Sequence, residues 1–215
     1  MGFGKKVALV LLIIGAVLMF DGYNSRNNLN NARNINDLYA SELETGMYVT
    51  GNIKDYLLRT KDSSGNSVST GVTYTDVING TQEKNAFAIK TRDNKYIQIF
   101  ISDQDVYEEL KSADFIKHLG NQPGIYVEGK IVNNTYEIQT EFFKSALKLR
   151  TDADVEKRVC TTLIIEQCNL SGRTARFDQG MMAIGAAILV LFVGMLSSGS
   201  RKKTAKELMK NPARR

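Results

Sequence analysis

The sequence predicts a membrane protein of the α+β class, in which two transmembrane helices flank a small β-barrel domain. Three observations support this class. Apolar runs lie near both ends of the 215-residue chain, basic residues border each run, and an octapeptide with strand-like alternation occurs twice.

The first apolar run covers residues 7–20, where fourteen consecutive residues carry no charge, "VALVLLIIGAVLMF". At ~1.5 Å per residue this helix is about 21 Å long, which is short for a hydrocarbon layer of roughly 30 Å. A helix over residues 3–23 reaches about 31 Å if the methylene stems of Lys5 and Lys6 carry their ammonium groups back to the headgroups. Residues 1–23 are therefore predicted to form the first span.

A lysine pair before an apolar run is also typical of a cleaved signal peptide. A cleavage site needs small residues just after the run, whereas Met19, Phe20 and Asp21 stand there. We therefore expect an uncleaved signal anchor.

The second span is predicted at residues 179–198. Residues 180–198 are nineteen uncharged residues, "GMMAIGAAILVLFVGMLSS", which extend about 28 Å as a helix. Small residues allow close helix approach in lipid, so the face of Ala183 and Ala187 is predicted to pack on Gly15 of the first span. This contact can form within one chain or between two chains, which would give a homo-oligomer. The alternative is that these small residues face the lipid.

Charge predicts the orientation of the two spans. The N-terminal lysine pair and the basic tail, residues 199–215, together hold nine of the 28 Lys and Arg residues and one of the 23 acids, so residues 21–178 have a net charge of −3. Basic residues that flank spans stay in the cytoplasm. Both termini are therefore predicted to be cytoplasmic, and the central domain to lie outside the plasma membrane.

Residues 24–45 are predicted to form a connector. Leu29, Ala32, Ile35 and Leu38 follow at three-residue intervals, which indicates an amphipathic helix leaving the membrane. The many asparagines of this segment favour a flexible tether as the alternative.

The repeated octapeptide predicts two strands. "GMYVTGNI" at residues 46–53 and "GIYVEGKI" at residues 124–131 share five of eight residues, and each alternates between apolar and other residues. Gly51 and Gly129 lie on the inward face of each copy. Glycine inside a strand marks a bulge, a sharp coil or a close backbone approach, so both glycines are predicted to be structural.

Further elements lie between and after the two copies. Residues 85–91 and 95–102 alternate around the turn "RDN" and predict a hairpin. Residues 102–120 predict a helix, with Ser102 and Asp105 as a capping box and Gly120 as the stop signal. Residues 135–143, "TYEIQTEFF", are predicted to form the fifth strand, and residues 59–84 a long loop or an extra hairpin.

This order of three strands, a helix and two strands resembles the OB-fold, a five-stranded barrel. The resemblance covers residues 46–147 and implies that the two octapeptides are the pair of strands that closes the barrel. Residues 148–178 are then a helical or irregular connector to the membrane. The whole architecture resembles small two-pass membrane proteins of Gram-positive bacteria, and more loosely the membrane-linked OB modules of the NfeD type.

Candidate chemical groups are few. The single histidine, His118, falls in the last turn of a predicted helix, where it is expected to act as a C-terminal charge partner. Cys160 and Cys168 do not have zinc-ligand spacing, and a disulfide between them requires a turn that "CTTLIIEQC" does not encode, so free thiols are favoured. Acidic residues after Thr151 fit a helix start better than a calcium loop.

These patterns predict no catalytic, cofactor-binding or metal residues. The negative central domain and its outside location count against a nucleic-acid partner, although Tyr48, Tyr126 and Lys130 could stack bases. We expect a non-catalytic interaction or scaffold module whose partners are the lipid bilayer and another membrane or envelope protein. A sensor for a small extracytoplasmic ligand is the alternative.

Overall fold

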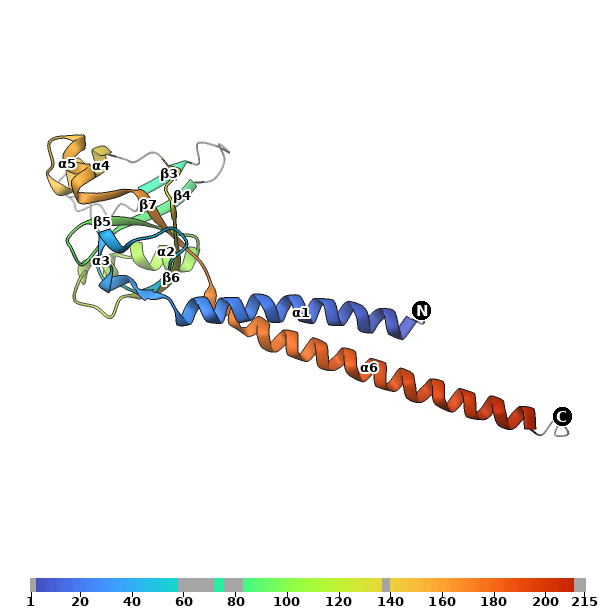
Figure 1. The fold of residues 1–215 in the computed structure, drawn as a ribbon. Coiled ribbons are helices and arrows are strands. Elements are labelled where there is room, and N and C mark those ends of the chain that lie inside the picture. Colours follow the sequence, from blue (N-terminus) through green and yellow to red (C-terminus); the bar gives the residue numbers. More distant parts are fainter. Residues whose placement is uncertain (1–2, 58–71, 76–82, 137–139, 211–215) are drawn as a thin grey trace. The chain divides into compact units, whose positions relative to one another are not determined.

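The computed structural model describes residues 3–57, 72–75, 83–136 and 140–210 (Figure 1). The chain divides into two compact units, one made of Met1–Asn27 with Leu170–Arg215 and the other of Asn28–Asn169.

Two long helices make up the first unit. Helix α1 is Phe3–Asn30 and helix α6 is Leu170–Lys210. Their segments Gly4–Asn30 and Leu170–Leu196 are long and apolar enough to cross a membrane. Both helices are longer than the sequence predicts, since α1 runs beyond residue 23 and α6 includes part of the predicted connector and of the basic tail. Residues 211–215 of the tail lie outside the described part of the chain.

A mixed sheet of seven strands forms the second unit, in the order β1-β2-β6-β7-β5-β4-β3. Pairs β1–β2 and β5–β7 are parallel and the other pairs are antiparallel. The strands are β1 Arg33–Asn34, β2 Tyr48–Ile53, β3 Val72–Thr75, β4 Glu83–Lys90, β5 Tyr96–Ile101, β6 Ile125–Asn133 and β7 Val159–Gln167.

The two octapeptides pair with each other, as predicted. They form β2 and β6, which run antiparallel with Val49 opposite Gly129 and Gly51 opposite Val127. The predicted hairpin is confirmed in β4 and β5, where Ile89 lies opposite Ile97.

The prediction of a closed barrel is wrong. Closure would require β2 to pair with β4, but the free edge of β2 is taken by β1, and one end of β4 pairs with β3. The segment after β2 contributes one bond across this gap, from Leu57 N–H to the carbonyl of Ala88 at 2.8 Å. The sheet stays open because its two edges are already paired with other segments.

The predicted fifth strand is also wrong. Of residues 135–143, those from Thr140 on belong to helix α4, Thr140–Leu147, while residues 137–139 lie outside the described residues. Phe142 and Phe143 are both buried, at helical spacing from the apolar residues at the end of α4. The strand that takes the fifth place, beside β6, is β7. Its sequence "VCTTLIIEQ" is rich in β-branched residues, which favour a strand. The segment 148–178, predicted as a connector, thus holds β7, helix α5 (Asp152–Arg158) and the start of α6.

The remaining helices also differ in detail from the prediction. The helix predicted after the third strand is two helices, α2 (Gln104–Lys111) and α3 (Ala113–Lys117), because Ser112 leaves α2 in an extended conformation and caps α3. Asp103, not Ser102, caps α2. Residues 24–45 do not form one helix, because α1 ends at Asn30 and the 3₁₀ turns η1 (Ile35–Asp37) and η2 (Ala40–Glu42) follow.

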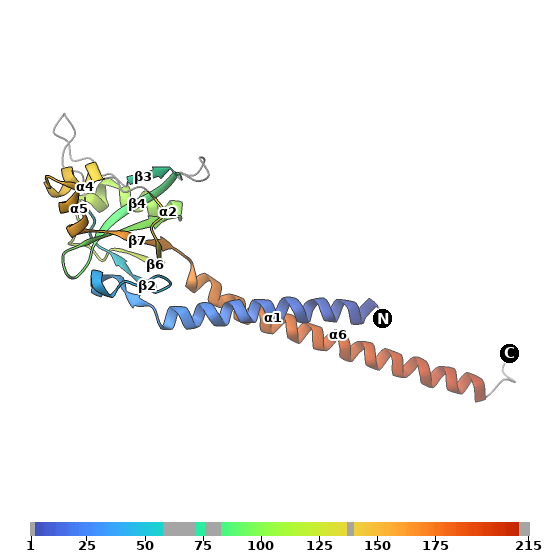
Figure 2. The same ribbon diagram turned by 45° about the horizontal axis from the view of Figure 1, so that its top comes forward.

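Apolar clusters lie on both faces of the sheet: one packs against α2 and α3, and the other packs under α4 and α5. Figure 2 shows α4 and α5 beside one end of the sheet and α2 near β4. The first cluster joins inward residues of the strands to η1, α2 and α3 through Ile35, Leu110 and Phe115. The second joins Ala86, Ala88, Phe100 and Ile164 to Phe142, Phe143 and Val155. Since successive side chains of a strand point to opposite faces, one sheet supplies both clusters.

Candidate functional site

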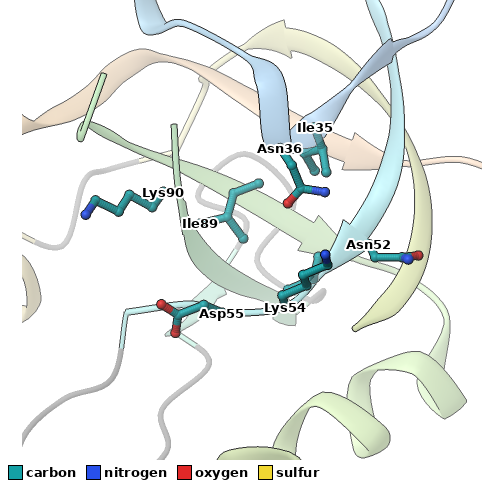
Figure 3. A pocket seen from close by; sticks show the side chains of 8 residues that line it. Ile35, Asn36, Asn52, Lys54, Asp55, Ile89 and Lys90 are labelled. Atoms are coloured by element: carbon teal, nitrogen blue, oxygen red, sulfur yellow. The ribbon is translucent and has the colours of Figure 1, made fainter. Parts of the chain in front are cut away.

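The gap between β2 and β4 carries a small pocket, here called the seam pocket. Its volume is about 90 Å³. The pocket lies between the end of β2, the end of β4 and η1 (Figure 3). Its lining residues are Ile35, Asn36, Asn52, Ile53, Lys54, Asp55, Ile89 and Lys90.

Gly51 explains how η1 comes so close to β2. Its φ of +145° favours glycine, and a Cβ atom at this position would lie 2.8 Å from both Asn34 Oδ1 and Ile35 Cγ2. Asn34 in turn caps η1, because its Oδ1 accepts a hydrogen bond from Asn36 N–H at 2.9 Å. The glycine thus leaves room for Ile35 to enter the core beside β2.

The other side of the gap is held by the turn between β4 and β5. The backbone N–H of Arg92 donates to the carbonyl of Leu38 at 2.8 Å, and Ala40 N–H donates to Asp93 Oδ1 at 3.0 Å. Burial raises the pKa of Asp93, but hydrogen bonds from Ala40 N–H and from the Thr91 hydroxyl outweigh it, so the pKa lies below its usual value. The ionised carboxylate is therefore the form that holds Ala40.

The seam pocket can accommodate little. Its volume corresponds to about three water molecules, whereas pockets for ordinary small ligands start at roughly 300 Å³. Its polar groups are the carboxamides of Asn36 and Asn52, the ammonium groups of Lys54 and Lys90, and the carboxylate of Asp55. The side chains of Asp55 and Lys90 extend away from Ile35 in Figure 3. These groups could hold a few waters or one small ion.

A second surface of interest is the outer face of β2 and β6, called the β2–β6 face and defined by Tyr48, Thr50, Asn52, Tyr126 and Lys130. Tyr126 is 53% exposed. The Lys130 ammonium lies 5.5 Å from the centroid of the Tyr48 ring, a cation–π contact. Burial and the neighbouring Glu128 carboxylate raise the pKa of Tyr126, so its hydroxyl stays protonated and can donate.

The predicted structural glycine of β6 lies in a crowded place. Gly129 is buried, and a Cβ atom there would lie 2.4 Å from Ile165 Cγ2 and 3.2 Å from the Glu166 carbonyl oxygen. Gly51 and Gly129 thus admit different neighbours, η1 in one case and β7 in the other.

The two cysteines lie at β7. Cys160 is in the strand and Cys168 follows its end; both are half-buried and neither forms a disulfide. Cys168 N–H donates to the carbonyl of Glu128 at 2.9 Å, so the chain remains bound to β6 beyond the last residue of β7.

Of the small residues predicted to pack the two spans, Gly15 of α1 and Ala187 of α6 are buried, and Ala183 of α6 is half-buried. The atoms nearest to a Cβ at Gly15 belong to Gly180 and Ile184, which flank Ala183 in α6. Ala187 is fully buried. Asp21 and Arg176 form an ion pair between the same two helices.

The other candidate groups have structural neighbours. His118 is the C-terminal cap residue of α3, and its Nδ1 lies 3.0 Å from the Asp114 carbonyl oxygen. Thr151 and Asp154 form the capping box of α5, which accounts for the acidic sequence there. Within the described part of the chain, no group of three or more His, Cys, Asp or Glu residues could hold a metal ion.

Residues 33–43, which the sequence predicts to be part of a connector, belong to the sheet domain. Ile35 and Leu38 are indeed apolar and regularly spaced, but they enter the core from extended and 3₁₀ backbone. The available signal was the pair Gly51 and Asn34, a flexible glycine and a capping asparagine, and their partnership is visible only in three dimensions.

No family model, curated protein or solved structure matches this chain.

Proposed function

We propose that this protein is a non-catalytic interaction module, anchored in the plasma membrane by α1 and α6. Both termini lie in the cytoplasm and the sheet domain lies outside, where its β2–β6 face binds another membrane or envelope protein. The length and apolar character of both helices support the membrane anchor. The basic residues at both ends of the chain support the orientation.

The observation that carries the proposal is the uneven covering of the sheet. Over β4, β5 and β7 the face that includes Ala88, Phe100 and Ile164 is buried under α4 and α5. The same face over β2 and β6 is covered less evenly: Val132 packs against that cluster and Glu128 is buried, but Tyr126 is the one large apolar or aromatic side chain that is exposed among those described in Asn28–Asn169. Tyrosine is enriched in protein interfaces because it combines a rigid apolar ring with a hydroxyl.

The OB-like strand order supports a protein partner over a nucleic acid. If β2, β4, β5, β6 and β7 are counted as the five OB strands, the face that OB-folds use for oligonucleotides and oligosaccharides lies on β4 and β5. In this protein α4 and α5 cover the outer residues of those two strands. A ligand would have to displace a packed apolar layer to reach them.

A photo-crosslinking amino acid at position 126 tests this function. The intact protein is purified from its own membranes in mild detergent after irradiation, and a matched probe at Thr162, an exposed position on β7, serves as the control. We expect a defined membrane or envelope protein to be captured from position 126 and not from position 162. Tyr126→Ala should weaken co-purification of that partner about tenfold, the effect of ~1.4 kcal/mol at an interface hot spot. Equal capture from both positions would remove this surface from the proposal.

A small-ligand sensor is the second candidate, and the seam pocket is the observation that favours it. Its volume of about 90 Å³ restricts the ligand to a few heavy atoms. Lys54 favours an anion, because the other two charged side chains of the lining, Asp55 and Lys90, extend away from Ile35 (Figure 3). Thermal unfolding of the intact protein with acetate or phosphate should then show a midpoint increase that Lys54→Ala abolishes. An increase that persists in this variant would place the anion elsewhere.

A further inference from the structure

Helix α6 continues past the N-terminal end of α1. We propose that Lys5 and Lys6, at this end of α1, bind the phosphate group of an anionic phospholipid and hold it below the level of the surrounding headgroups. The proposal rests on the membrane anchor proposed above and does not depend on the β2–β6 face or its partner.

The contacts between the two helices determine how far α1 reaches along α6. The helices run antiparallel. A Cβ atom at Gly15 would lie 2.9 Å from the Gly180 carbonyl oxygen, and one at Gly4 would lie 3.9 Å from Val190 Cγ1. Gly4 is the second residue of α1, whereas α6 runs on from Val190 to Lys210. These last residues of α6 extend about 30 Å, and Figures 1 and 2 both show them beyond the N-terminus.

An ion pair marks the other end of the apolar part of α1. Asp21 Oδ2 and Arg176 Nη1 lie 2.5 Å apart, and charged groups of this kind belong at the membrane surface. The fourteen uncharged residues between Lys6 and Asp21 extend about 21 Å, roughly 9 Å less than a hydrocarbon layer of about 30 Å. With the ion pair at one membrane surface, Lys5 and Lys6 therefore lie below the headgroups of the other, and their methylene stems recover part of this distance.

Helix α6 is long enough to reach that second surface alone. Its uncharged stretch, residues 180–198, extends about 28 Å, and the next basic residue is Arg201. Arg201 follows Val190, the neighbour of Gly4, by about 17 Å along the helix. The basic residues of α1 and those of the tail therefore lie at two different depths, and the lysine pair of α1 is the one beside the apolar segment of α6.

The charges near the lysine pair favour an anionic ligand. No acidic residue precedes Asp21 in the sequence, and none lies between Asp178 and Glu207, so neither helix supplies a counter-charge at this depth. Both lysines are exposed. An unpaired ammonium group below the headgroups is costly, and a phosphate group compensates it through charge-assisted hydrogen bonds. A headgroup with a net negative charge is preferred to a choline headgroup, because choline would bring a further cation close to the lysines.

The helix surfaces on both sides of the lysine pair have room for the rest of the lipid. Gly180, Ala187 and Gly194 follow at seven-residue intervals on the face of α6 that packs on α1. Ala187 is fully buried, but Gly194 is exposed and a Cβ atom there would meet nothing within 4 Å. This open place lies past the end of α1 and can take the headgroup. Toward the membrane interior, α1 presents the exposed side chains of Leu9 and Val10 to the acyl chains.

Native mass spectrometry of the intact protein in detergent tests this site. The protein is titrated with phosphatidylglycerol and, separately, with phosphatidylcholine of the same acyl chains. We expect the first phosphatidylglycerol to bind roughly tenfold more tightly, since each lysine near an anionic lipid contributes to its attraction. Lys5→Gln with Lys6→Gln should abolish this preference, and Lys5→Arg with Lys6→Arg should keep it. The matched control, Lys202→Gln with Lys203→Gln, removes the same charge from the tail and should leave the preference unchanged.

Two results would overturn the site. One is a wild-type protein that binds both lipids equally well. The other is an equal loss of preference in the two glutamine variants, which would show a general attraction of basic residues for anionic lipid. Incorporation into lipid nanodiscs is measured in parallel: a protein that enters nanodiscs without a lipid preference loses this site and keeps its anchor. A protein that stays in solution without detergent or lipid would lose both the site and the anchor.

Discussion

Replacing Gly129 with larger residues tests the packing between β2, β6 and β7. Gly129 lies between Val49 and Gln167, and its φ is not in the left-handed region, so a substitution there acts through sterics. A Cβ atom would lie 2.4 Å from Ile165 Cγ2, more than 1 Å closer than the roughly 3.5 Å at which carbon atoms make favourable contact. Ile165 is 0% exposed and cannot turn to solvent. We expect Gly129→Ala to lower the free energy of unfolding by about 1 kcal/mol and Gly129→Val by about 3 kcal/mol.

A double-mutant cycle with Ile165→Ala isolates this contact. Ile165→Ala alone should cost about 2 to 5 kcal/mol because it leaves a cavity, but the methyl group of Gly129→Ala can occupy part of that space. The double variant should therefore be destabilised by at least ~0.5 kcal/mol less than the sum of the two single changes. Urea unfolding of the intact protein in mild detergent measures this through tyrosine fluorescence, since the chain has nine tyrosines and no tryptophan. Additive effects, or a Gly129→Val variant of unchanged stability, would refute the packing argument.

Three further predictions concern topology, helix packing and pH. A reporter that is active only in the cytoplasm should be active after Arg215 and silent near Gly65; activity at both sites would contradict an outside domain. Cysteines at Gly15 and Ile184, in a background without the native cysteines, should form a disulfide under mild oxidation, because a Cβ atom at Gly15 lies 2.7 Å from Ile184 Cγ1; no better yield than from a lipid-facing pair would argue against this helix contact. The lowered pKa of Asp93 adds stability that is fully present above about pH 4, the usual aspartate pKa, and is lost as the pH falls through the lowered value. Asp93→Asn should therefore reduce the difference between the urea midpoints at pH 7 and pH 3; an unchanged difference would show that Asp93 does not contribute to it.

Local patterns predicted much of the fold correctly. The hairpin of β4 and β5 follows from alternation around a polar turn, and Asn94 in that turn has a φ of 62°, a conformation that asparagine tolerates. The octapeptides pair as predicted because both copies present the same apolar alternation and a glycine that admits a close neighbour. In each case the determining residues lie within the element or repeat in its partner.

The strand assignment failed where two segments had similar local preferences. Residues 135–143 alternate well enough to suggest a strand, yet Phe142 and Phe143 are buried in a helix over the sheet. The place beside β6 is taken by β7, whose Ile164 and Ile165 contribute to opposite faces of the sheet. Which segment wins depends on both apolar clusters at once, and no local window contains that comparison.

The sequence by itself determined the two long apolar helices, the strand character of the octapeptides and the position of the hairpin, because these depend on hydrophobicity and on periodicity within short segments. The tertiary structure decided that the sheet stays open, that residues 33–43 fill the gap beside β2, and that α4 and α5 cover β4 and β5. Strand edges and sheet faces are shared by segments far apart in the chain, and the free energy of occupying them depends on which competing segment packs there best.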